Sequence, residues 1–153
     1  MSRADDYIPI TVALLGLLGG LSIAILNRRA DIEARRRQAY AAAMQVLVEW
    51  IEYPYRIRRR TSDDLMELQR LADIGHDIQQ RLRYHKTWVL LEHPPTGKLY
   101  TEVLAAISGR VGAACKNSWT LPPISTAADM NLAGWGPRSL ESELSRLQAA
   151  IST

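Results

Sequence analysis

The chain of 153 residues contains one cysteine, Cys115, and three histidines. A lone cysteine excludes an intrachain disulfide, which agrees with a reducing compartment. A zinc site would need more cysteines or a spaced histidine pair such as H-E-x-x-H, and the sequence has neither. The segment Asp73-x-x-His76-Asp77 resembles half of a carboxylate–histidine site, but di-metal bundles need a second such segment. We therefore expect no metal and no cofactor.

Signatures of catalysis are also missing. The sequence has no phosphate-binding loop of the G-x-G-x-x-G or G-x-x-x-x-G-K-[ST] kind, and no G-x-S-x-G nucleophile elbow. A reactive thiol needs an electropositive and partly exposed setting, and Lys116 alone does not supply one for Cys115. Cys115 is therefore expected to be a small core residue. The chain is predicted not to be an enzyme.

Charge is absent from nineteen consecutive positions, residues 8–26. A helix of this length spans about 28 Å, close to the hydrocarbon thickness of a bilayer. This pattern predicts a transmembrane helix, preceded by a short N-terminal segment (1–7) and followed by one domain (27–153). Two alternatives fit these residues less well. A buried core helix is disfavoured, because such a helix is shorter and has a polar face. A cleaved signal peptide is disfavoured, because it begins with net positive charge, whereas residues 1–7 carry Arg3 against two aspartates.

Basic residues follow this apolar segment, whereas only Arg3 precedes it. The asymmetry predicts an N-terminus outside the plasma (inner) membrane and a cytoplasmic domain over 27–153. We expect the arginines nearest the bilayer to contact anionic lipid headgroups. They are Arg28, Arg29, Arg35, Arg36 and Arg37. Within the segment, Gly16, Gly20 and Ala24 fall four residues apart, a pattern that lets two membrane helices pack closely and makes homo-oligomerisation a hypothesis.

The rest of the chain has helical periodicity and no convincing strand. Apolar residues recur every three to four positions, Pro54 and the Pro94-Pro95 pair interrupt the pattern, and Thr61 to Asp64 supplies an N-cap. The expected helices cover 27–53, 63–92, a segment that begins at 96–99, a short stretch at 127–133, and a final helix opened by Pro137. These elements predict an all-α protein in which the membrane helix continues into an antiparallel bundle of about four helices. The irregular loop at 118–136 either folds over the open end of the bundle or binds a partner.

Positive charge is concentrated near the predicted membrane segment. Residues 27–60 have a formal charge of +5, whereas residues 61–153 have −1. A second cluster of arginines follows the aromatic residues Trp50, Tyr53 and Tyr55, and could bind a partner or nucleic acid. It consists of Arg56, Arg58, Arg59 and Arg60.

These features predict a single-pass membrane protein that presents a cytoplasmic helical bundle to an unknown protein partner. One alternative is a membrane-tethered nucleic-acid-binding protein that uses residues 50–60. A further alternative is a small holin-like membrane protein, which is disfavoured because the apolar segment has no polar face to line a pore.

Overall fold

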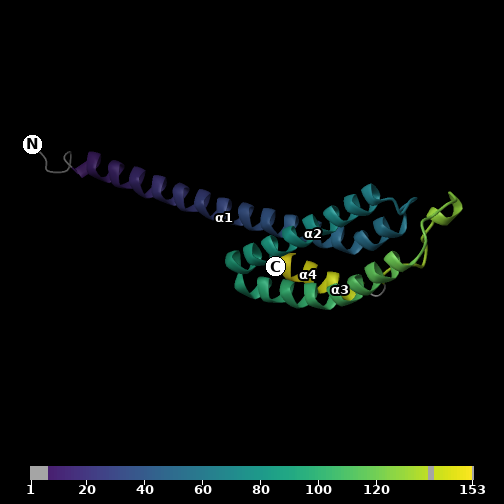
Figure 1. The fold of residues 1–153 in the computed structure, drawn as a ribbon. Helices are drawn as coiled ribbons and strands as arrows, with labels where there is room; N and C mark the ends of the chain where they lie inside the picture. Colours follow the sequence, from purple (N-terminus) through teal and green to yellow (C-terminus); the bar gives the residue numbers. More distant parts are fainter. Residues whose placement is uncertain (1–6, 138–139, 153) are drawn as a thin grey trace, which may run out of the picture. The chain divides into compact units, whose positions relative to one another are not determined.

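The chain is built from α-helices. The computed structural model describes the backbone of residues 7–137 and 140–152, and the side chains in these ranges except those of 7–19, 21 and 152. Its elements are α1 (Tyr7–Arg58), α2 (Leu65–Glu92), α3 (Pro94–Thr120), the 3₁₀ helix η1 (Ala128–Met130) and α4 (Glu141–Ser152) (Figure 1). The described residues contain no β-strand, and the prediction of an all-α chain is confirmed.

Two compact units divide the chain, residues 1–37 and residues 38–153, and α1 contributes to both. In the first unit, the described side chains of α1 are exposed apart from that of Arg36, which is half-buried. Arg37 forms an ion pair of 3.0 Å with Glu33, one helical turn earlier. Both members of this pair are exposed, so it adds little stability.

The predicted membrane span falls in this first unit. Among the residues whose side chains are described, no helix is both long enough and apolar enough to cross a membrane. Positions 8–19 and 21 of the predicted span lie outside that set. Its described positions, Gly20 and 22–26, are followed closely by Arg28 and Arg29, and so form a short apolar stretch. The prediction of a transmembrane helix over 8–26 is therefore not supported by the structure, although the backbone there is helical.

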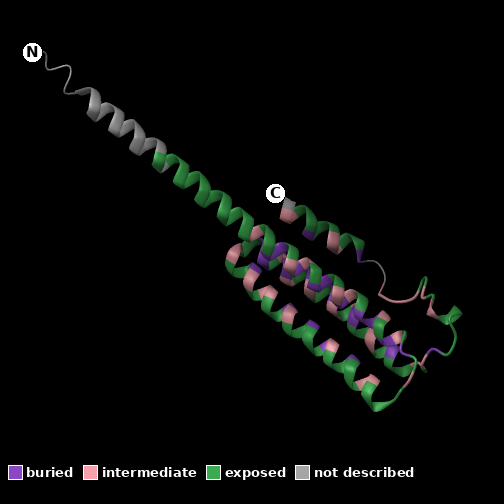
Figure 2. Cartoon of the chain, turned by 90° about the horizontal axis from the view of Figure 1, so that it is seen from above, coloured by how far each residue is buried: buried purple, intermediate pink, exposed green. Residues whose placement is uncertain are grey.

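The second unit is a helical bundle with a hydrophobic core, as predicted. The core draws on the second half of α1, on α2, α3 and α4, and on Leu140 just before α4 (Figure 2). Its largest fully buried aliphatic side chains include Leu47, Ile107 and Leu147. Burial of each such side chain contributes about 1.5–3 kcal/mol, which makes this face of the helices the main source of stability.

Hydrogen bonds and ion pairs establish how the helices run. Glu49 of α1 pairs with Arg81 of α2 at 2.5 Å, and the Tyr53 hydroxyl donates to the Leu71 carbonyl at 2.8 Å. Later positions of α1 thus meet earlier positions of α2, so these helices are antiparallel. The Tyr100 hydroxyl of α3 donates to the Ala43 carbonyl at 3.2 Å, and that of Ser118 to the Pro54 carbonyl at 3.0 Å, so α1 and α3 run in parallel.

The end of α1 differs from the prediction. Pro54 predicts either an end or a kink of the helix, and the first alternative is wrong, because α1 continues through Pro54 to Arg58. Proline lacks the N–H that would bond the preceding turn, and this cost is offset by packing. Pro54 is fully buried, and Ile57, in the extra turn, has no exposed surface.

The boundaries of the later helices follow local chemistry. Asp64 caps α2, because its carboxylate accepts the Glu67 N–H at 2.8 Å, and the predicted helix over 63–92 is confirmed to within two residues. Pro94-Pro95 does end α2, but the same pair opens α3, since proline suits the first turn of a helix. The predicted short helix at 127–133 is reduced to η1, and α4 begins at Glu141 rather than at Pro137.

Candidate interaction surface

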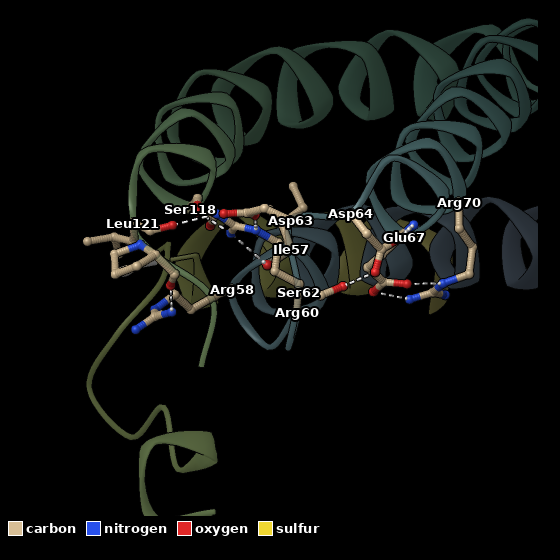
Figure 3. Close-up of polar contacts among 11 residues, drawn as sticks. Ile57, Arg58, Arg60, Ser62, Asp63, Asp64, Glu67, Arg70, Ser118 and Leu121 are labelled. Atoms are coloured by element: carbon tan, nitrogen blue, oxygen red, sulfur yellow. Dashed lines mark hydrogen bonds and ion pairs between the residues drawn. The ribbon is translucent and has the colours of Figure 1, made fainter. Parts of the chain in front are cut away.

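Arg60 organises the end of the bundle at which α1 and α3 finish and α2 begins. Its side chain is 2% exposed, and its Nε donates to a carboxylate oxygen of Asp63 at 2.6 Å. The terminal nitrogens donate to backbone carbonyls of three residues (Figure 3). These are Ile57 at 3.3 Å, Ser118 at 2.8 Å and Leu121 at 2.5 Å. We call this arrangement the Arg60 clamp.

The Arg60 clamp supplies hydrogen-bond donors to helix ends, which lack them. The last carbonyls of a helix have no intrahelical donor and carry partial negative charge, which a cation nearby stabilises. The guanidinium of Arg60 supplies this cation and several donors at once to the ends of α1 and α3. The ring of Trp119 lies 5.6 Å from the guanidinium carbon and adds a cation–π contact.

Ser118 joins α3 to α1 at the same place. It has no exposed surface, and its hydroxyl lies 2.8 Å from the Ala114 carbonyl and 3.0 Å from the Pro54 carbonyl. A larger side chain at residue 118 would separate the two helices beside the Arg60 clamp. The small, polar residue therefore allows their close approach.

The loop after α3 is fastened to the end of α1. The Tyr55 hydroxyl donates to the Trp135 carbonyl at 2.9 Å, and the two rings meet edge to face with centroids 5.3 Å apart. The Ile124 N–H donates to the Arg60 carbonyl at 2.9 Å, and Ile124 is buried. Gly136 adopts φ 104°, a conformation that favours glycine, directly against the Tyr55 ring. Residues 121–136 thus lie over the end of α1, which agrees with the first of the two interpretations of this loop.

The four arginines of the predicted patch lie in different environments in the structure. Arg60 is buried in the clamp, Arg58 donates to the Pro122 carbonyl at 3.0 Å, and Arg59 donates to the Met130 carbonyl at 3.5 Å. Arg56 is exposed and contributes to the electrostatic field at Glu49. Burial removes Arg60 from any outward patch, so a role in binding a partner or nucleic acid stays a prediction for Arg56, Arg58 and Arg59.

Exposed apolar side chains lie next to the Arg60 clamp. Leu65 and Met66, in the first turn of α2, are 78% and 83% exposed, and Trp119 is 37% exposed. The two α2 residues line an open hollow of about 720 Å³ together with polar neighbours. Those neighbours are Thr61, Ser62, Asp64, Glu67 and Arg70. We call Leu65 and Met66, which line this hollow together, the apolar rim.

Charged groups border the apolar rim. The Arg70 guanidinium makes two hydrogen bonds of 2.7 Å to Glu67, which hold the pKa of that carboxyl below its usual range. A hydrogen bond from Ser62, with the Glu67 N–H as a second donor, lowers the pKa of Asp64. Both acids are therefore ionised at neutral pH, so the rim combines apolar contact area with charges of both signs.

The spacing of Leu65, Leu68 and Leu71 by itself predicts that all three lie on the buried face of α2. The structure leaves Leu65 exposed, whereas Leu71 is buried. The first residue of a helix can extend beyond the neighbouring elements that cover later turns, so periodicity alone does not decide its burial. The sequence feature that indicates their exposure is the position of Leu65 and Met66 directly after the Asp64 cap, in the first turn of the helix.

The remaining predicted residues lie elsewhere. Gly20 and Ala24 are exposed, and the Gly16 side-chain position lies outside the described set. Of the arginines expected at lipid headgroups, Arg36 is half-buried and the other four are exposed. They are Arg28, Arg29, Arg35 and Arg37. Helix packing at the small residues and lipid contact at the arginines stay predictions.

The described residues include no group of three or more His, Cys, Asp and Glu side chains that could hold a metal ion. His76 is exposed. Cys115 is partly buried and packs against the core, and burial raises the pKa of its thiol to about 11. The thiolate is therefore scarce at neutral pH, as expected for a residue that packs rather than reacts.

Comparison with known proteins gave no match. Neither the family models, nor the curated proteins, nor the solved structures include one that matches this chain.

Proposed function

We propose that this chain is a membrane-tethered interaction protein, in which the helical bundle presents the apolar rim to a protein partner. The proposal is carried by the exposure of Leu65 and Met66 beside the Arg60 clamp. Large apolar side chains that cluster at a rigid site and have charged neighbours are typical of protein-binding surfaces. The rim is small, so a transient partner with a short apolar segment fits it best.

The tether is supported by the sequence. Residues 8–26 are uncharged and are followed by arginines, the pattern of a membrane helix with a cytoplasmic flank. In this proposal the segment stays in the plasma (inner) membrane, residues 27–153 lie in the cytoplasm, and Arg28 and Arg29 contact anionic lipid. The protein then acts by concentrating and orienting its partner at the membrane surface rather than by chemistry.

The partner surface is tested by photo-crosslinking of the full-length protein in intact cells. A photoreactive phenylalanine analogue replaces Met66 in one variant and Glu102, an exposed residue of α3, in the control. We expect a discrete protein adduct at residue 66, none at residue 102, and loss of the adduct when Leu65→Ser is added. Equal adducts at both positions, or none at residue 66, would contradict the proposed surface.

The tether is tested separately, by alkaline extraction of cell membranes that contain the full-length chain. We expect the protein to remain with the membrane pellet and to be released only by detergent. Release by alkaline carbonate alone would show that the chain is not embedded in lipid. That result would remove the tether and leave the crosslinking result to stand by itself.

Nucleic acid is the competing partner, because Arg56 and Arg59 are exposed near Tyr55. Binding to phosphate weakens steeply with salt, so a titration with DNA and RNA at about 50 mM and about 200 mM salt separates the two hypotheses. We expect no affinity at the lower salt concentration. Salt-dependent binding that Arg56→Gln weakens would favour nucleic acid.

A further inference from the structure

The end of the bundle opposite the Arg60 clamp carries an exposed apolar face. The clamp lies where α2 begins, and the opposite end is the turn at which α2 finishes and α3 starts (Figure 1). Tyr84 and Leu91, in the last three turns of α2, are 62% and 77% exposed. Trp88, between them, is half-buried, and its ring centroid lies 5.9 Å from that of Tyr84. The three residues are spaced by four and three positions, so they share one side of the helix, which we call the aromatic end face.

The composition of the aromatic end face is typical of groups that lie at a membrane–water interface. Tryptophan and tyrosine concentrate there, because each ring is apolar while its N–H or O–H stays in contact with water and lipid headgroups. Leu91 adds an aliphatic side chain of the kind that enters the boundary between headgroups and acyl chains. The face therefore combines the two types of side chain that an interfacial helix presents to lipid.

Positive charge accompanies this face. Residues 78–91 contain no Asp or Glu, and residues 83–98, which span the turn, have a formal charge of +2. The remainder of the unit 38–153 has ten basic and eleven acidic side chains, a charge of −1. Anionic lipid attracts basic side chains that come within about 8 Å, the Debye length at physiological salt. The basic side chains at this end are Arg83, Lys86 and Lys98, with Glu92 as the one acid among residues 83–98.

The turn that carries these charges is closely packed. An added Cβ at Gly97, in the first turn of α3, would lie 2.3 Å from the Leu90 Cα, so the two backbones touch. This contact keeps Lys98, which is exposed, at the same end of the bundle as Leu91. Apolar and basic groups are thus held together before any partner binds, which lowers the entropy cost of binding.

The same end of the bundle is the one that α1 enters. The Tyr100 hydroxyl, near the start of α3, donates to the carbonyl of Ala43, which lies five residues after this unit begins. Residues 27–37 join the unit to the uncharged segment 8–26, and eleven residues reach no further than about 40 Å even when fully extended. The Arg60 clamp lies beyond the other end of α1, roughly 30 Å further along the helix. A tether in residues 8–26 therefore brings the aromatic end face, rather than the apolar rim, to the lipid.

We propose that the aromatic end face docks on the anionic lipid surface of the membrane that holds residues 8–26. Leu91 and the Trp88 ring enter the interface, the Tyr84 hydroxyl stays at the level of the headgroups, and Lys86 and Lys98 lie close to lipid phosphates. This inference rests on the tether of the proposed function and adds an orientation to it. The apolar rim then faces away from the membrane, where a protein partner can reach it.

The experiment places a nitroxide on the full-length protein in vesicles of phosphatidylcholine and phosphatidylglycerol. Single cysteines are introduced as Leu91→Cys, Met66→Cys or Ile23→Cys in a Cys115→Ala background. Electron paramagnetic resonance then measures collisions with oxygen, which concentrates in lipid, and with a water-soluble nickel complex. We expect the oxygen-to-nickel ratio to be severalfold higher at residues 91 and 23 than at residue 66. Vesicles of phosphatidylcholine alone should lower the ratio at residue 91 and leave it unchanged at residue 23.

The outcomes separate the docking from the tether. A label in lipid at residue 23 but in water at residue 91 overturns the docking and leaves the tether standing. Labels in water at both positions overturn the tether, and the docking with it. A label at residue 91 that is shielded from both reagents shows that protein, such as a second copy of the chain, covers the face, which overturns the assignment to lipid.

The basic side chains are tested with the same label at residue 91. Lys86→Gln combined with Lys98→Gln is expected to lower the oxygen-to-nickel ratio severalfold, because the attraction to phosphatidylglycerol is weakened. Lys116→Gln is the matched control, since Lys116 is exposed near the other end of α3, and it should leave the ratio unchanged. Equal effects of the two changes would contradict a specific role for the charges at this end.

A second measurement keeps the test decisive if the cysteine variants fail to fold. Brominated lipids quench the emission of a tryptophan that enters the bilayer, and the full-length protein needs no label for this. We expect the quenched part of the emission to be lost in Trp88→Phe and kept in Trp119→Phe, whose residue is 37% exposed at the opposite end of the bundle. Quenching that persists unchanged in Trp88→Phe overturns the proposal.

Discussion

The contribution of an arginine to the stability of this protein depends on whether its side chain is buried. Arg56 and Arg60 belong to the same basic cluster, yet Arg56 is exposed and Arg60 is buried. Charge in an exposed side chain is screened by water and salt, and contributes little to stability. In the Arg60 clamp the same charge is bound by three carbonyls and one carboxylate, and its removal takes the guanidinium donor away from each of them.

We expect Arg60→Met to lower the free energy of unfolding by about 2–4 kcal/mol, because buried carbonyls lose their donors. Urea denaturation followed by circular dichroism measures the loss. Arg56→Met serves as the control and should change stability by less than about 0.5 kcal/mol. Equal effects of the two substitutions would show that the clamp does not stabilise the fold.

At Gly75 the surrounding atoms leave no room for a side chain. An added Cβ would lie 2.6 Å from Cζ of the Tyr53 ring, whereas at Gly109 nothing lies within 4 Å. The Tyr53 hydroxyl is fixed by its bond to the Leu71 carbonyl, so the ring cannot move freely.

Gly75→Ala is therefore expected to destabilise the protein by about 1–3 kcal/mol, even though alanine is the better helix former. Gly109→Ala, also in a helix but in open space, should raise stability by up to about 1 kcal/mol. Thermal denaturation of both variants compares the two effects. A stabilising Gly75→Ala would mean that the Tyr53 ring yields to the methyl group.

At the scale of elements, the helices were predictable where local chemistry decides them. The cap at Asp64 and the proline pair at 94–95 act on their nearest neighbours, and the boundaries of α2 followed from them. The end of α1 was not predictable in this way. The turn after Pro54 is held by contacts with residues about sixty positions later, including Ser118, and periodicity does not register such contacts.

The loop at 121–136 is likewise stabilised by contacts with a distant part of the chain. Tyr55 on α1 bonds the Trp135 carbonyl across 80 positions. Tyr55→Phe removes this hydrogen bond but keeps the ring, so we expect chymotrypsin to cleave the loop severalfold faster, with a loss of about 1 kcal/mol in stability.

Tyr84→Phe is the matched control for the loop, because Tyr84 is an exposed tyrosine of α2. It should leave the cleavage rate unchanged. If Tyr55→Phe is cleaved at the rate of the unsubstituted protein, the loop is held by packing alone.

At the scale of the whole molecule, the stability of the bundle should depend on pH through His85. This residue is half-buried on α2 and contacts the rings of Tyr84 and Trp88, and its Nδ1 has no hydrogen-bond partner among the described residues. Burial, with the nearby charge of Arg81, lowers the pKa of His85 below 6.5. The unfolded chain, in which the pKa returns to its ordinary value, binds this proton more readily.

Protonation of His85 thus favours the unfolded state. Stability is fully present above pH 6.5 and is expected to fall as the pH drops from 6.5 toward the lower pKa of the folded state. Urea denaturation at several pH values measures this slope, which His85→Gln should flatten. A slope that survives in His85→Gln would assign the pH dependence to another group.

Composition and spacing by themselves determined the helical class of this protein, the succession of helices in the bundle and the position of a charged segment after an apolar one. These properties depend on residues three or four positions apart, which the sequence displays directly. Only the tertiary structure decided that Arg60 is buried, that Leu65 and Met66 are exposed, and that Tyr84 and Leu91 are exposed at the opposite end of the bundle. Such outcomes depend on which groups from distant parts of the chain come to lie together, because burial and hydrogen-bond partners are properties of the packed molecule.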